Sequence, residues 1–121
     1  MATETIFLKA KSKKDGTTVL KLKNKSGTKW HDNTLTSDVE AGDDVLWELH
    51  NDSIKAINNV YSKNKTNIFS ANPTPNKDGT WSGTISLNAL PGAEEPYSIQ
   101  YTTPDDKIHL DDPTLKVKAP N

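Results

Sequence analysis

An adjacent tryptophan and histidine, Trp30 and His31, stand in an otherwise polar stretch of the chain. An exposed indole beside a hydrogen-bonding group suits a sugar ring, because the aromatic plane packs against the apolar side of the ring while polar neighbours bind its hydroxyls. Tyr61 supplies a further aromatic side chain. These three are therefore the candidate ligand-binding residues. Trp81 and Phe69 are either further parts of an aromatic platform or members of the core.

Aspartates gather toward the end of the sequence, at Asp105, Asp106, Asp111 and Asp112. Carboxylates in loops are ligands that Ca²⁺ prefers, and the loops at one end of a β-sandwich can bring several of them to one ion. The same residues also favour turns, because an aspartate side chain hydrogen-bonds the main chain nearby. Their spacing does not match the D-x-D-x-D-G calcium loop. We therefore expect turn chemistry and keep a calcium site as a hypothesis.

The three histidines, His31, His50 and His109, are the other candidate metal ligands. Their spacing matches no ligand motif, although a fold could bring them together. Because the chain has no cysteine, it has no disulfide, thiolate metal site or cysteine nucleophile. The serine hydrolase, zinc protease, phosphate-loop and dinucleotide-binding motifs are missing as well. We expect no catalytic residue, and the protein is predicted not to be an enzyme.

Charge is unevenly distributed along the 121 residues, whose formal net charge is -1. Eight lysines and two acidic residues precede residue 30, whereas seven lysines and fourteen acidic residues follow it. A basic arm could bind nucleic acid, but the chain lacks arginine, which specific readers of guanine and phosphate favour. We therefore expect no nucleic-acid partner, and we expect the lysines to lie opposite acidic residues on a solvated sheet surface.

Neither a membrane span nor a secretory signal is evident in the sequence. No apolar run approaches the length of roughly 20 residues that a spanning helix needs. The first residues lack the positive segment and the apolar stretch of a signal peptide. The chain as it stands is therefore expected to be soluble and cytoplasmic, and secreted only if a leader has been removed.

Short strands must position these side chains. Apolar and polar residues alternate along the chain, interrupted by turn signals such as Asp15-Gly16 and Asp78-Gly79. Strands are predicted at residues 6–11, 18–23, 45–50, 54–61, 80–87, 97–101 and 114–118, with short pieces near Leu35 and at 67–70. Trp47 is expected to anchor the core, and two prolines predict a loop at residues 72–75.

The strand pattern predicts the fold class. Seven to nine strands at this spacing, without a convincing helix, are typical of an all-β, antiparallel Greek-key sandwich of two sheets. The length and the economical apolar content of 32% favour one domain over residues 1–121, with a C-terminal tail at residues 119–121 that frays.

Part of this pattern resembles a known family. The segment Gly42-Asp43-Asp44-Val45-Leu46-Trp47, followed by Asn51-Asp52, resembles the G-D-x-V-x-W strand of the cupredoxins, the blue-copper β-sandwich proteins. The segment from Tyr97 to Tyr101 is similar to the strand that leads into their copper loop. The resemblance covers about Val39 to Val117 and implies a cupredoxin-like fold. An immunoglobulin-like or fibronectin-like sandwich is the alternative.

Carried over residue by residue, the resemblance implies no copper site. Tyr101 stands where the family has its cysteine ligand, and Pro104 stands at the expected place of the second histidine. Residues 53–57 contain no histidine for the first position, and the only methionine is Met1. Blue copper needs a thiolate and two imidazoles, which these positions do not supply.

The resulting interpretation is a non-catalytic binding or protein-interaction module on a copper-free, cupredoxin-like sandwich. One alternative is a carbohydrate-binding module or lectin, with Ca²⁺ assisting at the acidic loops. A second alternative is a non-blue metal-binding protein that uses the histidines. The partner is expected to be a protein or a glycan, and an exposed sheet edge could also pair two copies of the chain.

Overall fold

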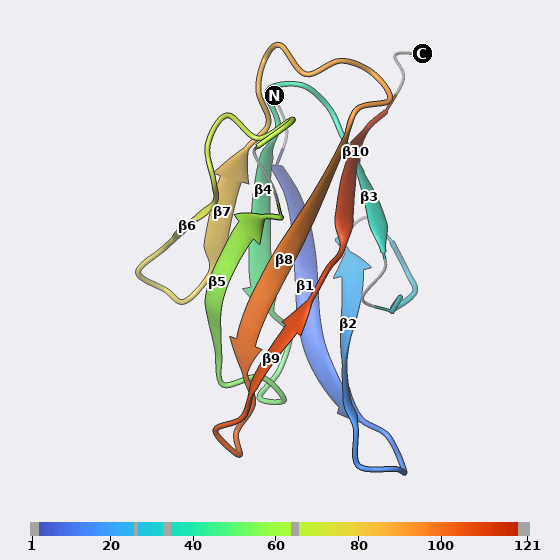
Figure 1. Cartoon of the computed structure of the whole chain (residues 1–121), viewed down its shortest axis with the longest axis vertical. Coiled ribbons are helices and arrows are strands. Elements are labelled where there is room, and N and C mark those ends of the chain that lie inside the picture. The colour runs from blue at the N-terminus through green and yellow to red at the C-terminus, as the bar shows by residue number, and fades with distance from the viewer. Residues whose placement is uncertain (1–2, 26, 33–34, 64–65, 119–121) are drawn as a thin grey trace.

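The computed structural model describes residues 3–25, 27–32, 35–63 and 66–118, which form two β-sheets without a helix (Figure 1). In chain order the strands are β1 (Thr3–Ser12), β2 (Thr18–Asn24), β3 (Thr36–Val39), β4 (Asp44–Leu49), β5 (Ala56–Ser62), β6 (Thr74–Pro75), β7 (Trp81–Thr84), β8 (Glu94–Thr102), β9 (Ile108–Asp111) and β10 (Thr114–Val117). The predicted fraying tail, residues 119–121, lies outside the described residues. Within the described part of the chain, no helix is long and apolar enough to cross a membrane.

The first sheet has the strand order β2-β1-β4-β7-β6. β1 and β2 form the predicted hairpin, and its turn contains Gly16 with a φ of 88°. Glycine adopts this conformation without the strain that a side chain would cause, which explains why Asp15-Gly16 marks the turn. β1 also pairs in parallel with β4, so that Ile6 lies opposite Trp47. β4 in turn pairs antiparallel with β7.

The second sheet has the strand order β3-β10-β8-β5, and β9 pairs with the C-terminal half of β8. β8 therefore contacts β5 along one side and β10 and then β9 along the other. In Figure 1, β8 crosses the front of the molecule diagonally, with β5 to its left and β9 and β10 to its right. β10 pairs in parallel with β3, so β3 is the outermost strand next to β10 in this sheet.

The two sheets share one core of alternating apolar side chains. Trp47 on β4 is fully buried, and its indole Nε1 donates a hydrogen bond of 3.2 Å to the hydroxyl of Tyr97 on β8. The Phe69 ring lies 6.1 Å from Trp47 and 6.3 Å from Tyr97, centroid to centroid. The predicted anchoring role of Trp47 is confirmed, and so are the all-β class and the two-sheet arrangement.

Two strands in the structure, β6 and β9, are missing from the sequence prediction. The short strand predicted at residues 67–70 is wrong, because Phe69 makes only an isolated bridge with Ile85 there. The described residues therefore form ten strands instead of seven to nine. β6 lies within the segment that its prolines predict to be a loop. It forms an edge of the first sheet, where Pro75 is tolerated because an edge strand need not donate every main-chain hydrogen bond. The apolar side chains of β9, Ile108 and Leu110, face solvent, so the strand gives no core pattern in the sequence.

The sheets are mixed, and the prediction of purely antiparallel pairing is wrong in this respect. The pairs β1–β4 and β3–β10 are parallel, whereas the other strand pairs in the described residues are antiparallel. Alternation of apolar and polar residues shows which side of a strand is buried, but it does not show which strand lies next to it. The long connections between these strands permit the parallel arrangement.

A buried carboxyl group connects β8 to the loop between β5 and β6. Glu95 is 1% exposed, and its Oε1 accepts hydrogen bonds from three successive main-chain N–H groups. The donors are Asn67 at 2.7 Å, Ile68 at 2.9 Å and Phe69 at 3.1 Å. The Ser62 hydroxyl donates to Oε2 at 2.9 Å. A carboxyl group is retained in a core only with such partners, so Glu95 fixes the loop that brings Phe69 into the core.

Candidate binding surface

Strand alternation gives the second sheet an inner and an outer face. On β8, every second residue from Tyr97 to Tyr101 points inward and is fully buried, as predicted. The residues between them point outward. One of these, Gln100, lies directly opposite Leu110 of β9, and Thr102, the next outward residue of β8, lies opposite Ile108. The side chains of these two β9 residues therefore also point outward.

β5 extends the outer face on the other side of β8. Its Asn59 lies opposite Gln100, and its Tyr61 lies opposite Ser98. Asn58 is the unpaired residue of a bulge in β5, and its amide nitrogen donates a hydrogen bond of 2.8 Å to the Thr102 hydroxyl on the same surface. We call this surface the neutral face because none of its members carries a charge. Its members are Asn58, Asn59, Tyr61, Gln100, Thr102, Ile108 and Leu110.

Two large aliphatic side chains of the neutral face are open to solvent. Ile108 is 63% exposed and Leu110 is 53% exposed. Exposed apolar groups that lie together on a rigid surface mark interaction sites more often than isolated ones do. Leu87 and Leu90 are also exposed, but they stand in the loop between β7 and β8, at the opposite end of the molecule from the β8–β9 turn (Figure 1).

Ion pairs lie at the rim of the neutral face. The Lys55 ammonium is 2.6 Å from Asp106 Oδ1, and the Lys63 ammonium is 3.6 Å from Asp112 Oδ2. Ser98 donates a hydrogen bond of 2.7 Å to Asp112 Oδ1. Because these charged side chains are largely exposed, the pairs contribute little to stability. An uncharged centre inside a polar rim is the arrangement found at protein–protein interfaces.

The outer face of the first sheet has a different chemistry. On β1 and β2, Lys9 lies opposite Lys21, and Phe7 lies opposite Lys23. The Trp30 ring packs onto these strands, and the ammonium groups of Lys9 and Lys23 lie 4.3 Å and 5.5 Å from its centroid. We call this surface the lysine face, and its members are Phe7, Lys9, Lys11, Lys21, Lys23, Trp30, Glu48 and His50.

The Trp30 indole is half-buried in the lysine face by contacts within the chain. The His50 ring meets it at a centroid distance of 4.9 Å with an interplanar angle of 66°, and Phe7 meets His50 at 6.3 Å. Each cation–π contact at such a site contributes about 0.5–1 kcal/mol. A sugar ring that stacked on the indole would have to displace Lys9 from the ring face that it occupies.

The structure does not bring the three predicted ligand-binding residues together. Trp30 lies on the lysine face of the first sheet, whereas Tyr61 lies on the neutral face of the second. His31 is exposed, and its main chain pairs with Leu22 through hydrogen bonds of 2.8 Å and 2.9 Å. Since successive residues of an extended segment point to opposite sides, the His31 side chain points away from Trp30.

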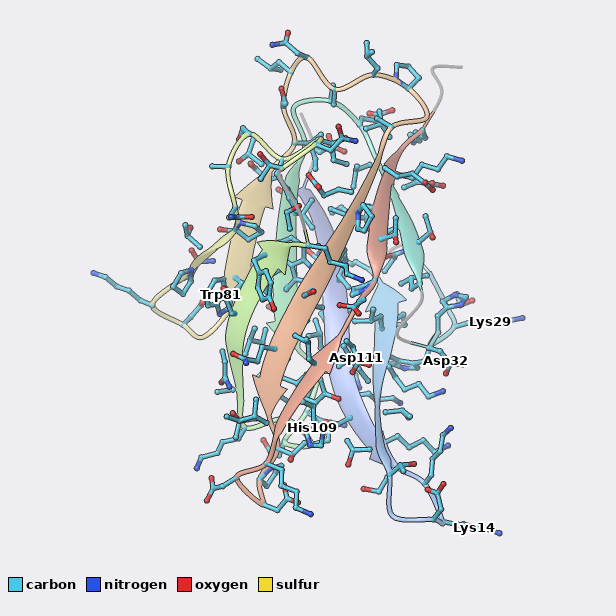
Figure 2. The ribbon with its side chains drawn as sticks, viewed as in Figure 1. Lys14, Lys29, Asp32, Trp81, His109 and Asp111 are labelled. Carbon is cyan, nitrogen blue, oxygen red and sulfur yellow. The ribbon has the colours of Figure 1, made fainter. Side chains whose placement is uncertain are left out.

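The two remaining aromatic candidates belong to the core. Trp81 is 9% exposed and Phe69 is 4% exposed. The Trp81 indole Nε1 donates a hydrogen bond of 3.1 Å to the carbonyl oxygen of Ile57. Figure 2 shows Trp81 at the left of the view, far from Lys29 and Asp32, which lie on the right beyond β2. These buried rings offer no platform to a ligand.

The four aspartates of the calcium hypothesis lie at the two ends of β9. Asp105 and Asp106 are in the turn that precedes the strand, Asp111 is its last residue and Asp112 follows it. The strand spans about 13 Å, so the two pairs do not meet at one point. Asp105 accepts a hydrogen bond from the Thr103 hydroxyl, which is the turn chemistry that the sequence also allowed.

The histidines are held apart by the fold. Within the described residues, no group of three or more histidine, aspartate and glutamate side chains is arranged to hold a metal ion. His50 contacts Phe7 and Trp30 on the lysine face. His109 on β9 stacks on the Tyr101 ring at a centroid distance of 5.1 Å. His31 lies at the edge of β2.

Tyr101, which stands at the cysteine position implied by the cupredoxin resemblance, is fully buried. Its hydroxyl donates a hydrogen bond of 3.1 Å to Asp111 Oδ2. Burial raises the pKa of Tyr101 above its ordinary value, and the charge of Asp111 raises it further. Burial likewise raises the pKa of Tyr97, although the hydrogen bond from Trp47 partly opposes the shift. Both phenols therefore stay protonated and act as structural hydrogen-bonding groups.

A groove of ≈ 460 Å³ runs over β4, β6 and β7 on the outer face of the first sheet. Small polar side chains dominate its lining, among them Ser70, Asn72, Thr74, Asn76, Ser82 and Thr84. Thr84 donates a hydrogen bond of 2.9 Å to Asp44, which also lines the groove. No motif in the sequence indicated this groove, because isolated serine, threonine and asparagine residues are typical of any solvated strand.

The neutral face was missed by the sequence reasoning for a similar reason. Alternation of Ile108 and Leu110 with His109 was visible, but the usual interpretation would bury the aliphatic residues. Only the register with β8 shows that they point outward. Comparison of the chain with protein-family models finds no matching family, and comparison with curated proteins finds no significant match.

Proposed function

We propose that the protein is a non-catalytic protein-interaction module and that the neutral face is its docking surface. The observation that carries this proposal is the exposure of Ile108 and Leu110 side by side on a rigid sheet. A protein partner can cover both aliphatic side chains with apolar groups and can satisfy the surrounding amides with hydrogen bonds.

The order of the neutral face supports the same role. Asn58 and Thr102 exchange side-chain hydrogen bonds of 2.8 Å and 3.1 Å across β5 and β8. The backbone beneath them is fixed by sheet pairing on both sides of β8. A surface that is ordered before binding loses less conformational entropy when a partner arrives. Because its side chains are uncharged, removing water from them costs less than removing water from charged groups would.

A cupredoxin-like identity of the sandwich belongs to this proposal. It is supported by the resemblance of residues 42–47 and by the place of that segment, which leads into β4 and ends at the buried Trp47. With Tyr101 at the cysteine position, the scaffold would serve binding instead of electron transfer.

The docking surface can be tested by affinity capture from an extract of the source cells. Gln100→Lys and Tyr61→Lys place a charge within the neutral face, and Leu87→Lys is the matched control because it adds the same charge to an exposed leucine elsewhere. We expect one or more proteins to be retained by the parent and by Leu87→Lys and to be lost with both face variants. Hydrogen exchange of the captured complex should then show added protection in β5, β8 and β9.

Identical sets of captured proteins for the parent and both face variants would overturn the proposal. Circular dichroism and thermal unfolding of each variant serve as the folding control. A partner whose added protection lies in β1 and β2 instead would move the docking surface to the lysine face.

The groove over β4, β6 and β7 supports a second candidate, a carbohydrate-binding module. Its hydroxyl and amide lining matches the hydrogen-bonding groups of a neutral sugar, and its volume suits a short oligosaccharide. A glycan array with the parent, Ser82→Tyr and Trp30→Ala separates the sites, because Ser82→Tyr obstructs the groove and Trp30→Ala removes the indole. Binding lost only with Ser82→Tyr would support the groove.

Calcium can be tested in the same experiment. The array is repeated with Ca²⁺ and with a chelator, and the Ca²⁺ content of the protein is measured. A glycan signal that disappears with the chelator would support calcium assistance. If no glycan is retained in either condition, the carbohydrate candidate is removed.

A further inference from the structure

β9 (Ile108–Asp111) is an edge strand with one open side. Among the described strands, β8 is its only pairing partner. In Figure 1, β3 covers the edge of β10 higher in the same sheet, whereas no described strand of that sheet lies beyond β9. An open edge carries N–H and C=O groups that can pair with another strand.

The open main-chain groups are those of Ile108 and Leu110. The Thr103 N–H donates a hydrogen bond of 3.0 Å to the Lys107 carbonyl, which places these two residues in a hydrogen-bonded pair at the start of the β8–β9 ladder. Hydrogen-bonded pairs alternate along an antiparallel ladder, so His109 faces β8 while Ile108 and Leu110 direct their main-chain groups outward. No described segment hydrogen-bonds to these outward groups.

The sequence of this edge is complementary to itself when it is reversed. Two copies of β9 can be aligned antiparallel with His109 opposite His109 of the second copy. Ile108 then lies opposite Leu110 of the second copy, and Lys107 lies opposite Asp111 of the second copy. In this register the outward groups of Ile108 and Leu110 form hydrogen-bonded pairs with the same groups of the other copy.

We propose that two copies of the chain form a two-fold symmetric dimer by pairing their β9 strands in this register. Each of the two hydrogen-bonded pairs contributes two main-chain hydrogen bonds, and two Lys107–Asp111 pairs flank them. Ile108 and Leu110 of both copies meet on the outer face, where their 63% and 53% exposure in one chain is reduced. Opposite charges and apolar pairs directly across a strand pair are both favourable.

The interactions that Lys107 makes within one chain leave it available to the second copy. Its ammonium lies 4.0 Å from Asp105 Oδ2, and both side chains are more than half exposed, so this contact is weak. Figure 2 shows His109 and Asp111 on β9 in the middle of the view, separate from Lys14 at the tip of the β1–β2 hairpin.

Symmetry and local sequence limit the assembly to two chains. A two-fold pairing of β9 with itself uses up both open edges, so no further copy can add by the same contact. Beyond β9 the Thr114 N–H donates a hydrogen bond of 3.1 Å to the Leu35 carbonyl, so the same side of the chain is already occupied there. The turn at Asp105 and Asp106 ends the ladder on the other side. The shared edge is therefore short, and we expect a dimer that dissociates in the micromolar range, since it buries less than the roughly 1,600 Å² of a standard interface.

The register is tested by charge reversal and sedimentation equilibrium over protein concentrations from micromolar to millimolar. Lys107→Asp places two carboxylates opposite each other across the interface, and Asp111→Lys places two ammonium groups opposite each other. Each variant alone should therefore lose at least tenfold in dimer affinity. An equimolar mixture of the two variants allows a mixed dimer with two oppositely charged pairs. In one pair the two substituted side chains meet, and in the other the original Asp111 of one chain meets the original Lys107 of the other. We therefore expect the mixture to dimerise at about the parent affinity.

Two controls separate this proposal from a folding defect and from the docking proposal. Leu87→Lys should leave the dimer affinity unchanged, and circular dichroism should show native strand content in Asp111→Lys, which loses the Tyr101 hydrogen bond. Gln100→Lys, which is one strand away from the edge, should also dimerise like the parent even if it loses an external partner. The two proposals can therefore fail separately.

Three results would overturn the dimer: a parent that stays monomeric at every concentration, single variants that dimerise as well as the parent, or a mixture that stays monomeric. Growth into larger species would contradict the closed two-fold arrangement.

Discussion

The two outer faces of the sandwich arise from the same strand alternation. They differ in whether side chains of the same chain cover their apolar groups. On the lysine face, Trp30 is covered by the side chains of Lys9 and Lys23 from its own chain. On the neutral face, Ile108 and Leu110 remain bare. An aromatic residue in a polar segment is thus a weaker sign of an open surface than aliphatic residues that the chain does not cover.

Side-chain length explains the difference. Lysine can lay its four-carbon stem over an apolar group and keep its ammonium in water. The neighbours of Leu110 on the neutral face are short by comparison, and the polar side chain directly opposite is that of Gln100. The neutral amide side chains do not cover the neighbouring aliphatic groups, so only a second molecule can bury them.

The largest loss of stability is expected from a substitution in the core that supports both faces. Trp47→Ala should lower the free energy of unfolding by about 3–5 kcal/mol, because it leaves a cavity beside Phe69 and Tyr97. Urea unfolding measures the loss. If tryptophan fluorescence and hydrogen exchange of the two sheets gave separate transitions, the two faces would not share one cooperative unit.

A smaller loss is expected when the support of the second sheet is removed. Glu95→Ala leaves the N–H groups of Asn67, Ile68 and Phe69 without their buried acceptor, at a cost of about 2–4 kcal/mol. Hydrogen exchange should accelerate at these three amides before it does so in β1 and β2. Glu95→Gln, which keeps one acceptor oxygen, is the matched control and should lose less.

The faces themselves should respond differently to truncation. Trp30→Ala should destabilise the protein by about 1–2 kcal/mol through lost packing and cation–π contacts, whereas Ile108→Ser should change the stability by less than about 0.5 kcal/mol. Chemical unfolding at dimer-free protein concentrations measures both. A loss with Ile108→Ser as large as that with Trp30→Ala would mean that the chain does cover its aliphatic side chains.

The smallest effect concerns pH and Glu4, at the beginning of β1. Its pKa is raised from 4.5 by burial and then by the charge of Asp43, and one of its carboxyl oxygens is buried without a hydrogen-bond partner among the described residues. The folded state therefore binds this proton more tightly than the unfolded state does. The contribution of this proton to the free energy of unfolding is fully present below pH 4.5 and is lost as the pH rises through the raised pKa.

Glu4→Gln should remove this dependence and be slightly more stable than the parent at pH 7, by less than about 1 kcal/mol because the group is partly exposed. Urea unfolding at about pH 4 and pH 7 compares the two proteins. A variant that is less stable than the parent at neutral pH would show that the carboxylate is stabilised by its surroundings.

The sequence predicts which side chains are buried in the core. Trp47 and the alternating residues from Tyr97 to Tyr101 are buried as expected, because burial on one side of a strand leaves a period of two in the sequence. The outward residues follow no such rule, so the neutral face could be found only through the register of β8 with β9. The role of Glu95 was equally hidden, since three of its partners are main-chain groups that leave no mark on residue type.

The sequence predicts the candidate site only in part, because strand pairing decides which side chains share a face. Residue type alone indicates Trp30 and Tyr61 as ligand-binding candidates, but their separation on two sheets depends on strand pairing. Alternation does not encode which strands become neighbours, as the parallel pairs β1–β4 and β3–β10 show.

The parallel pairing of β3 with β10 also has a consequence for how the chain folds. Thr36 meets Thr114, so most of the polypeptide lies in the loop that this contact closes. Closing such a loop costs chain entropy before the contact returns any energy. Folding is therefore expected on the millisecond-to-second scale of proteins rich in distant contacts, with the local β1–β2 and β8–β9 hairpins able to form first and the β3–β10 pair last.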